Sequence, residues 1–146
     1  VWPMIVHIND SESKQAVVKW LAKGALRPTQ QRMILAQHLI GDGNNRHVTA
    51  QSLFKLSNDQ NHKVSLATVY NTLHAFCEAG LVREITIRGS KSYFDTNMTD
   101  HPHFYWEDTA ELIDASPTSC HLYPLPELPP KAVIAKIDVL IRLRRK

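Results

Sequence analysis

The first half of the chain carries apolar residues at helical spacing. Four segments show this pattern: 13–23, 29–40, a run that begins after Thr49, and a run that begins after Ser65 and ends at Gly80. Thr and Ser are residue types that cap helices, because their side-chain oxygens accept a backbone N–H of the first turn. The spacing therefore predicts four helices.

After Gly80 the period of the pattern changes to two. Residues 81–88 and 91–95 alternate between apolar and polar side chains, with a Gly-Ser pair between them. This arrangement predicts a β-hairpin closed by a two-residue turn. Helices followed by a hairpin are typical of a winged helix-turn-helix, so we expect that domain over 1–95, with an N-terminal helix and arm in 1–25.

The remaining part, 96–146, contains shorter runs. Aromatic and β-branched residues in 101–107 and 110–115 indicate two strands around a turn. The prolines of 123–130 exclude a regular helix or a central strand there. Strict alternation over 133–143 predicts a third, half-buried strand. Three strands alone make a poor core, so we expect this sheet to pack against a second copy of the chain.

The segment after Ser65 has two distinct faces. At about 100° per residue its larger apolar residues share one side. The opposite side carries Ala67, Tyr70, Asn71 and His74. Asn can hydrogen-bond adenine, and Ala and Tyr can pack on thymine methyl groups, so this face is suited to reading base edges. An ordinary solvated face with a chance tyrosine explains the same pattern equally well.

The small positive net charge of the chain is weak evidence for a polyanionic partner such as a nucleic acid. The net charge is +3, and residues 1–95 carry 11 Lys and Arg against 7 Asp and Glu. The candidate phosphate contacts are Arg27, Arg32, Lys55, Lys63, Arg88 and Lys91. Each of them alone is as well explained as a solubilising charge. Arg88 and Lys91 flank the expected wing tip, and Arg27 precedes a helix, where it could enter a minor groove.

Histidines and carboxylates form a second candidate constellation. His101 and His103 are two residues apart, so on a strand both would project from one face. With His47, Asp95 and Asp114 they make a nitrogen and oxygen donor set that suits Zn²⁺, Mn²⁺ or Fe²⁺. Histidines that simply hydrogen-bond nearby carboxylates remain the alternative. Of the other histidines, His121 is a candidate ligand, and His7, His38 and His62 are expected to be surface or core residues.

The sequence gives little indication of an enzyme or of a membrane-spanning helix. The sequence has no HExxH motif and no evident nucleophile–base pair, so we expect no enzyme. No apolar run approaches the roughly 18 residues of a membrane-spanning helix. Two cysteines 43 residues apart make no disulfide framework, and a cytoplasmic location is expected. A metallohydrolase and a winged-helix module that binds protein or RNA remain the rival classes.

Five stretches resemble the ferric uptake regulator (Fur) superfamily. They are LRPTQQR (26–32), HVTAQSLF (47–54), VSLATVYNTLHAFCEAGLV (64–82), GSKSYFDTN (89–97) and HPHF (101–104). In detail they look like its iron response regulator (Irr) branch. The resemblance implies an α/β (α+β) fold: an N-terminal winged helix-turn-helix, then a small α/β dimerisation domain over 96–146 with a three-stranded sheet.

The resemblance also implies a function. Such proteins are metal- or haem-responsive regulators of transcription in iron and haem homeostasis, which act as homodimers, or as tetramers, on AT-rich palindromic DNA. The regulatory metal sits at the hinge between the domains, and its ligands fall on His47, Asp95, His101, His103 and Asp114. The expected DNA contacts are Arg27, Arg32, Lys63, Ser65, Ala67, Thr68, Tyr70, Asn71, His74, Arg88 and Lys91.

The sequence departs from the family pattern in three places. Trp106 and Thr109 stand where many members carry the CxxC cysteines of a structural zinc site. The second metal site is poorly preserved, and the dimerisation helix is replaced by the proline-rich segment. Neither cysteine precedes a proline, so a Cys-Pro haem motif is absent. Haem binding through His101 and His103 is the remaining route, and it would compete with a divalent ion.

Overall fold

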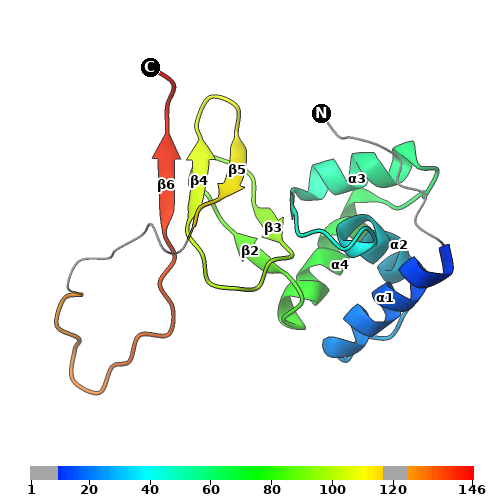
Figure 1. The fold of residues 1–146 in the computed structure, drawn as a ribbon, viewed down its shortest axis with the longest axis horizontal. Helices are drawn as coiled ribbons and strands as arrows, with labels where there is room; N and C mark the ends of the chain where they lie inside the picture. Colours follow the sequence, from blue (N-terminus) through cyan, green and yellow to red (C-terminus); the bar gives the residue numbers. More distant parts are fainter. Residues whose placement is uncertain (1–9, 117–124) are drawn as a thin grey trace. The chain divides into compact units, whose positions relative to one another are not determined.

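The structure is a computed structural model that describes residues 10–116 and 125–146. His7 and His121 lie outside the described residues, as does part of the proline-rich segment. The chain splits into two compact units, Val1–Met98 and Thr99–Lys146. Figure 1 shows helices and a small sheet in the first unit and strands in the second. Along the described chain no helix is long and apolar enough to cross a membrane.

All four predicted helices are present in the first unit. They are α1 (Asp10–Lys23), α2 (Gln30–Ile40), α3 (Ala50–Asp59) and α4 (Leu66–Glu78). The side chains of Thr29, Thr49 and Ser65 cap the last three helices by accepting a backbone N–H three residues later. A residue of this type at the N-cap stabilises a helix by about 1 kcal/mol relative to alanine, so the caps fix where these helices begin.

The helices enclose a continuous apolar core. Side chains from all four of them are fully buried: Val17, Leu21, Leu35, Leu39, Leu53, Val69, Leu73 and Phe76. Trp20 contacts Phe76 edge-to-face, with ring centroids 5.1 Å apart. Burying one large apolar side chain contributes about 1.5–3 kcal/mol, so this core dominates the stability of the first unit.

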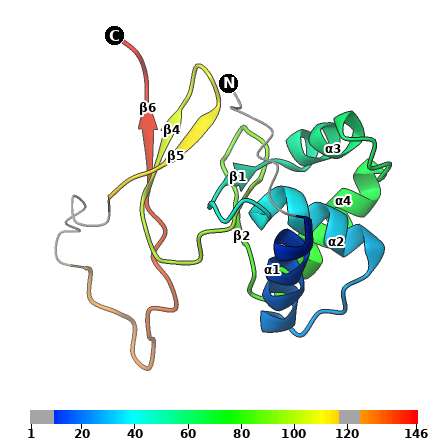
Figure 2. The ribbon, with the colours of Figure 1, turned by 45° about the vertical axis from the view of Figure 1, so that its right-hand side comes forward.

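The sheet of the first unit contains one strand more than the pattern predicted. It is antiparallel in the order β1 (His47–Val48), β3 (Tyr93–Asp95), β2 (Arg83–Ile85). The hairpin is confirmed, but the predicted two-residue turn is wrong. The last pair of the ladder is Ile85 with Tyr93, so a longer loop, residues 86–92, connects the two strands. Strand β1 leads directly into α3 (Figure 2) and has only two residues, too few to show a period.

The second unit holds the expected three-stranded sheet. Its order is β5 (Glu111–Asp114), β4 (His103–Trp106), β6 (Leu140–Leu143), with β4 antiparallel to β5 and parallel to β6. In the described part of this unit there are strands and no helix. The α+β class is thus confirmed, with every described helix in the first unit.

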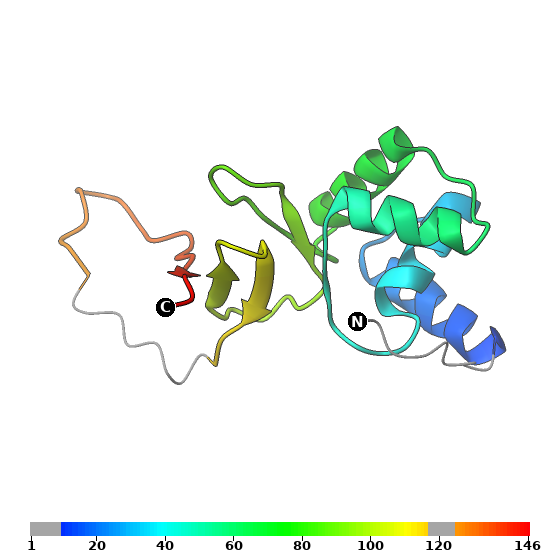
Figure 3. The same cartoon turned by 90° about the horizontal axis from the view of Figure 1, so that it is seen from above.

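The predicted C-terminal strand over 133–143 is too long. Only Leu140–Leu143 form a strand, and Figure 3 shows residues 125–139 (orange) without regular structure before it. The ladder has four residues because its neighbour β4 has four. Val133 is 87% exposed, so the alternating apolar face that the sequence predicted is not buried in the single chain.

Candidate metal centre and nucleic-acid interface

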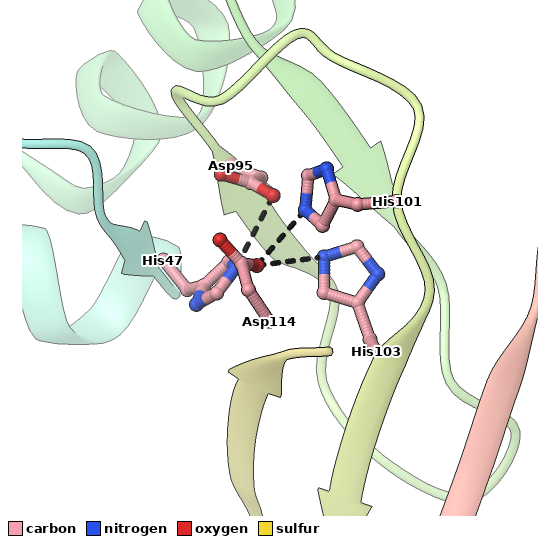
Figure 4. Close-up of side chains that lie close together, drawn as sticks. All are labelled: His47, Asp95, His101, His103 and Asp114. Atoms are coloured by element: carbon pink, nitrogen blue, oxygen red, sulfur yellow. Dashed lines mark hydrogen bonds and ion pairs between the residues drawn. The ribbon is translucent and has the colours of Figure 1, made fainter. Parts of the chain in front are cut away.

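The first donor pair is created by strand register. His47 on β1 lies directly opposite Asp95 on β3, and His47 Nε2 is 3.1 Å from Asp95 Oδ2 (Figure 4). The side chain of Asp95 is only 1% exposed. Its other oxygen, Oδ1, accepts the backbone N–H of Asn97 at 2.8 Å. A buried carboxylate held in this way presents one fixed oxygen to the histidine.

Hydrogen bonds of Arg46 stabilise the strand that carries His47. Its backbone N–H donates to Thr96 Oγ1 at 2.9 Å, and its carbonyl accepts the N–H of Thr96 at 3.1 Å. Its guanidinium donates to the carbonyl of His38 at 3.0 Å and pairs with Asp42. A two-residue strand has little stability of its own, so these bonds are what hold His47 opposite Asp95.

The second donor group lies in the other unit. Nε2 of His101 and Nε2 of His103 lie 2.9 Å and 3.3 Å from the same oxygen, Oδ1 of Asp114 (Figure 4). His103 and Asp114 are register partners across β4 and β5. One ligand atom from each of the three residues lies within 4.8 Å of the others. The ring centroids of the two histidines are 4.4 Å apart.

The hydrogen bond of His101 defines what its other nitrogen can do. Nδ1 of His101 lies 2.5 Å from the carbonyl oxygen of Thr99, which can only accept, so Nδ1 carries the proton. In a neutral ring Nε2 then has a lone pair, and it points at a carboxylate oxygen that also has lone pairs. Two acceptors approach this closely only around a shared cation, a proton or a metal ion.

The sequence prediction for these histidines needs one correction. We expected His101 and His103 on one strand, but β4 begins at His103 and His101 precedes it. Their common direction therefore comes from the Thr99 contact and from Asp114, and a strand period does not account for it. Within their own units, the structure brings His47 to Asp95, and His101 and His103 to Asp114.

The predicted recognition face of α4 points outward. Ala67, Asn71 and His74 are exposed, whereas Val69, Leu73 and Phe76 are buried. Tyr70 is half-buried, and its ring packs against the edge of the core. Ser65 accepts the N–H of Thr68 at 3.1 Å and its hydroxyl lies 2.9 Å from Thr68 Oγ1, so both side chains are engaged at the start of α4.

One contact of this face was missed by the sequence analysis. Nε2 of Gln51, on α3, donates to the hydroxyl oxygen of Tyr70 at 2.9 Å. The two residues are 19 positions apart, and no sequence period links them. The signal that could have led to Gln51 is the Thr49 cap, because it places Gln51 in the first turn of the helix that packs on α4.

The candidate phosphate contacts differ in exposure. Arg27, Lys55, Lys63, Arg88 and Lys91 are exposed. Arg32 is half-buried, and its guanidinium donates to the carbonyl of Arg27 at 3.1 Å. Arg32 therefore holds the backbone next to Arg27, and in this structure its side chain is directed toward the protein.

Three further titratable side chains, His38, His62 and Cys77, lie in the first unit. Nε2 of His38 is 3.1 Å from Nδ1 of His62. Burial lowers the pKa of His38 to about 4, helped by the neighbouring charges of His62 and Arg46. Burial also raises the pKa of the Cys77 thiol to about 11, so Cys77 is protonated and unreactive at neutral pH. His38 and His62 are both half-buried.

Comparison with known proteins agrees with this architecture. Residues 23–120 match the ferric uptake regulator family. The peroxide-responsive repressor PerR of Staphylococcus aureus is 32% identical over 112 residues, which cover 76% of this chain and 74% of that protein. PerR of Staphylococcus epidermidis is 31% identical over 105 residues, covering 72% and 68%. The ferric uptake regulator of Pseudomonas aeruginosa, solved with manganese, has a TM-score of 0.67 at 23% identity, covering 89% of this chain and 98% of that one.

These matches decide between the rival classes. The family match spans about two thirds of the chain, from α1 to beyond β5. The fold of the solved regulator is shared, which neither a metallohydrolase nor an unrelated interaction module would explain. The chain therefore belongs to the ferric uptake regulator family, whose members are metal-responsive, DNA-binding regulators of transcription and not enzymes.

Proposed function

We propose that His47, Asp95, His101, His103 and Asp114 together bind one divalent metal ion that controls DNA binding. The observation that carries this proposal is the convergence of Nε2 of His101 and Nε2 of His103 on one oxygen of Asp114. The His47–Asp95 pair repeats the same contact in the first unit. A divalent cation between such lone pairs removes their repulsion, and nitrogen and oxygen donors suit Fe²⁺, Mn²⁺ and Zn²⁺.

The connection between the units makes a joint site feasible. Asp95 and His101 are six residues apart, and the boundary between the units falls between them. Six extended residues span at most about 20 Å, so the two donor groups cannot separate far. Bound there, the ion would fix the angle between the DNA-binding unit and the dimerisation unit, and so the spacing of two recognition helices on a palindrome.

The DNA-binding role belongs, in this proposal, to residues 1–95 and the dimerisation role to 96–146. The outward face of α4 reads an AT-rich site, with Tyr70 and Asn71 on base edges. The exposed Arg27, Lys63, Arg88 and Lys91 contact phosphates. The exposed apolar residues of 125–141 give the second unit a surface for a second copy of the chain. We place the regulator in the cytoplasm, where the genes of iron and haem homeostasis would be its targets.

A titration of operator affinity tests the proposed site. The dimer is titrated with Mn²⁺, Fe²⁺, Zn²⁺ and haem while its Kd for an AT-rich palindrome is followed. One of the divalent ions should change the Kd in the wild-type chain, and neither Asp95→Ala nor His103→Ala should respond, although both remain dimers in gel filtration. Asp59→Ala, an exposed carboxylate on α3, serves as the control. An undiminished metal response in Asp95→Ala would contradict the proposal, and a response to haem alone would favour haem over the divalent ion.

A further inference from the structure

Gln51 sits at a position that the fold defines sharply. It is the second residue of α3, whose start is set by reciprocal bonds between Thr49 and Ser52. The N–H of Ser52 donates to Thr49 Oγ1 and the N–H of Thr49 donates to Ser52 Oγ, both at 3.0 Å. This capping box leaves the first turn of α3 little freedom, so the half-buried side chain of Gln51 has a fixed origin.

Tyr70 is restrained on more than one side. Its ring packs against the edge of the core, and His74, one turn later on α4, meets it edge-to-face with centroids 6.5 Å apart. At the far end of the ring, the hydroxyl oxygen accepts the Gln51 amide at 2.9 Å. The ring is thus held along its length and at its tip before any ligand arrives.

The direction of the Gln51 hydrogen bond determines whether the Tyr70 hydroxyl can donate a hydrogen bond to a ligand. A phenol has one O–H donor and can also accept. Because the amide N–H of Gln51 donates, it occupies a lone pair of the Tyr70 oxygen and leaves the phenolic proton unused. That proton is available to an acceptor, and DNA offers thymine O4, purine N7, guanine O6 and phosphate oxygens.

We infer that Gln51 is a positioning residue for DNA recognition, which fixes the hydroxyl of Tyr70 as a hydrogen-bond donor toward the duplex. The inference rests on the proposal that the α4 face reads DNA. It adds a residue from the neighbouring helix that determines what the tyrosine selects. A hydroxyl fixed as a donor favours acceptor groups and disfavours the amino groups of adenine and cytosine at the same place.

A double-mutant cycle on the metal-loaded, full-length protein tests the inference. The variants are Gln51→Met, which keeps the length of the side chain but removes its donor, Tyr70→Phe, and the two combined. Tyr70→Ala, which removes the ring as well as the hydroxyl, is measured beside them. The probe is the duplex that the wild-type protein selects from a random pool, and both the Kd and the base preference at each position are measured. Gln60→Met, an exposed glutamine at the end of α3, is the matched control.

We expect Gln51→Met and Tyr70→Phe each to weaken binding about 3- to 10-fold and to flatten base preference at the same position. Adding Gln51→Met to Tyr70→Phe should cost nothing further. An equal loss from Gln51→Met in both backgrounds, no loss, or tighter binding would overturn the inference. If Tyr70→Ala weakens binding but Tyr70→Phe does not, the ring reads DNA while the inference about the hydroxyl fails. If neither weakens binding, the proposed reading face is wrong as well.

Discussion

Asp95 and Asp114 occupy equivalent places in their sheets, each directly across an antiparallel pair from a histidine. Their surroundings differ, because the side chain of Asp95 is 1% exposed and that of Asp114 is 40% exposed. The same register, which sets a histidine opposite an aspartate, thus gives one buried and one exposed carboxylate. The histidine side chains of both groups are largely buried, with 15% of His47, 4% of His101 and 6% of His103 exposed.

The first unit has a large apolar core built by four helices, whereas the second unit has little core. Tyr105, Leu112 and Ala115 are its buried apolar side chains among the described residues. It is joined instead by exposed ion pairs between the β4–β5 turn and the C-terminal end: Glu107 with Arg142 and Arg144, and Asp108 with Arg145. Arg145 also lies over the Trp106 ring, 4.7 Å from its centroid. The comparison predicts that the two units respond to different perturbations.

The largest difference should come from removing each aspartate in turn. In the metal-free protein, Asp95→Ala removes the buried carboxylate that contacts His47 Nε2 and accepts the N–H of Asn97, which costs about 1–3 kcal/mol of unfolding free energy. Asp114→Ala should cost less, because the carboxylate of Asp114 is 40% exposed and water can replace it. Urea unfolding of both variants measures this. Equal costs would show that burial does not distinguish the two groups.

Acid should act next, and on the first unit. The pKa of His38 is lowered from 6.5 to about 4 in the folded chain, so between these values the unfolded chain binds more protons. Stability is therefore fully present above about pH 6.5 and falls as the pH drops toward 4. The loss is on the order of 1 kcal/mol when solvent screening is allowed for.

Unfolding midpoints of the metal-free chain at pH 7 and pH 5 measure the acid effect. His38→Gln should flatten this dependence, and the exposed His74→Gln should leave it unchanged. A dependence that survives His38→Gln with its original slope would assign the acid sensitivity to other groups.

Salt should produce the smallest effect, and it should act on the second unit. Hydrogen bonding and charge from Arg144 lower the pKa of the exposed Glu107, which reports an attraction that ions in solution screen. Raising NaCl from about 0.1 to 1 M should lower the unfolding midpoint of the second unit. Trp106 fluorescence follows this midpoint in a chain whose other two tryptophans, Trp2 and Trp20, are replaced by Phe. The variant Glu107→Gln should show less of this decrease, whereas Glu111→Gln, on the exposed part of β5, should behave like the wild type.

Local signals explain why the helices could be predicted. Thr49 and Ser65 are residue types that favour N-caps, so they predict where α3 and α4 begin. The 3.6-residue period of apolar residues identifies the buried face of α4. Strand β1 could not be predicted in this way, because a two-residue strand has no period and exists through Arg46 and Thr96. Alternation over 133–143 showed which residues share a face, but the length of β6 depends on its neighbour β4.

The candidate site could be predicted only in part, because contacts between distant segments leave no local pattern in the sequence. Residue chemistry and the family resemblance supplied the five donors, but 48 positions separate His47 from Asp95, and only the β1–β3 register brings them together. The prediction that His101 and His103 share a strand failed, since a backbone carbonyl orients His101. Gln51 was missed because its role is defined by a contact between two helices. The placement in the iron response regulator branch stays a prediction.

The central claim, one ion bound jointly by both donor groups, is tested most directly by counting Mn²⁺. Free Mn²⁺ is measured by electron paramagnetic resonance as the ion is added to the wild-type chain, His47→Ala and His103→Ala. A joint site predicts one regulatory ion per wild-type chain, and a large loss of affinity for that same ion in each variant. Two ions per wild-type chain, with one retained at full affinity in each variant, would contradict the account.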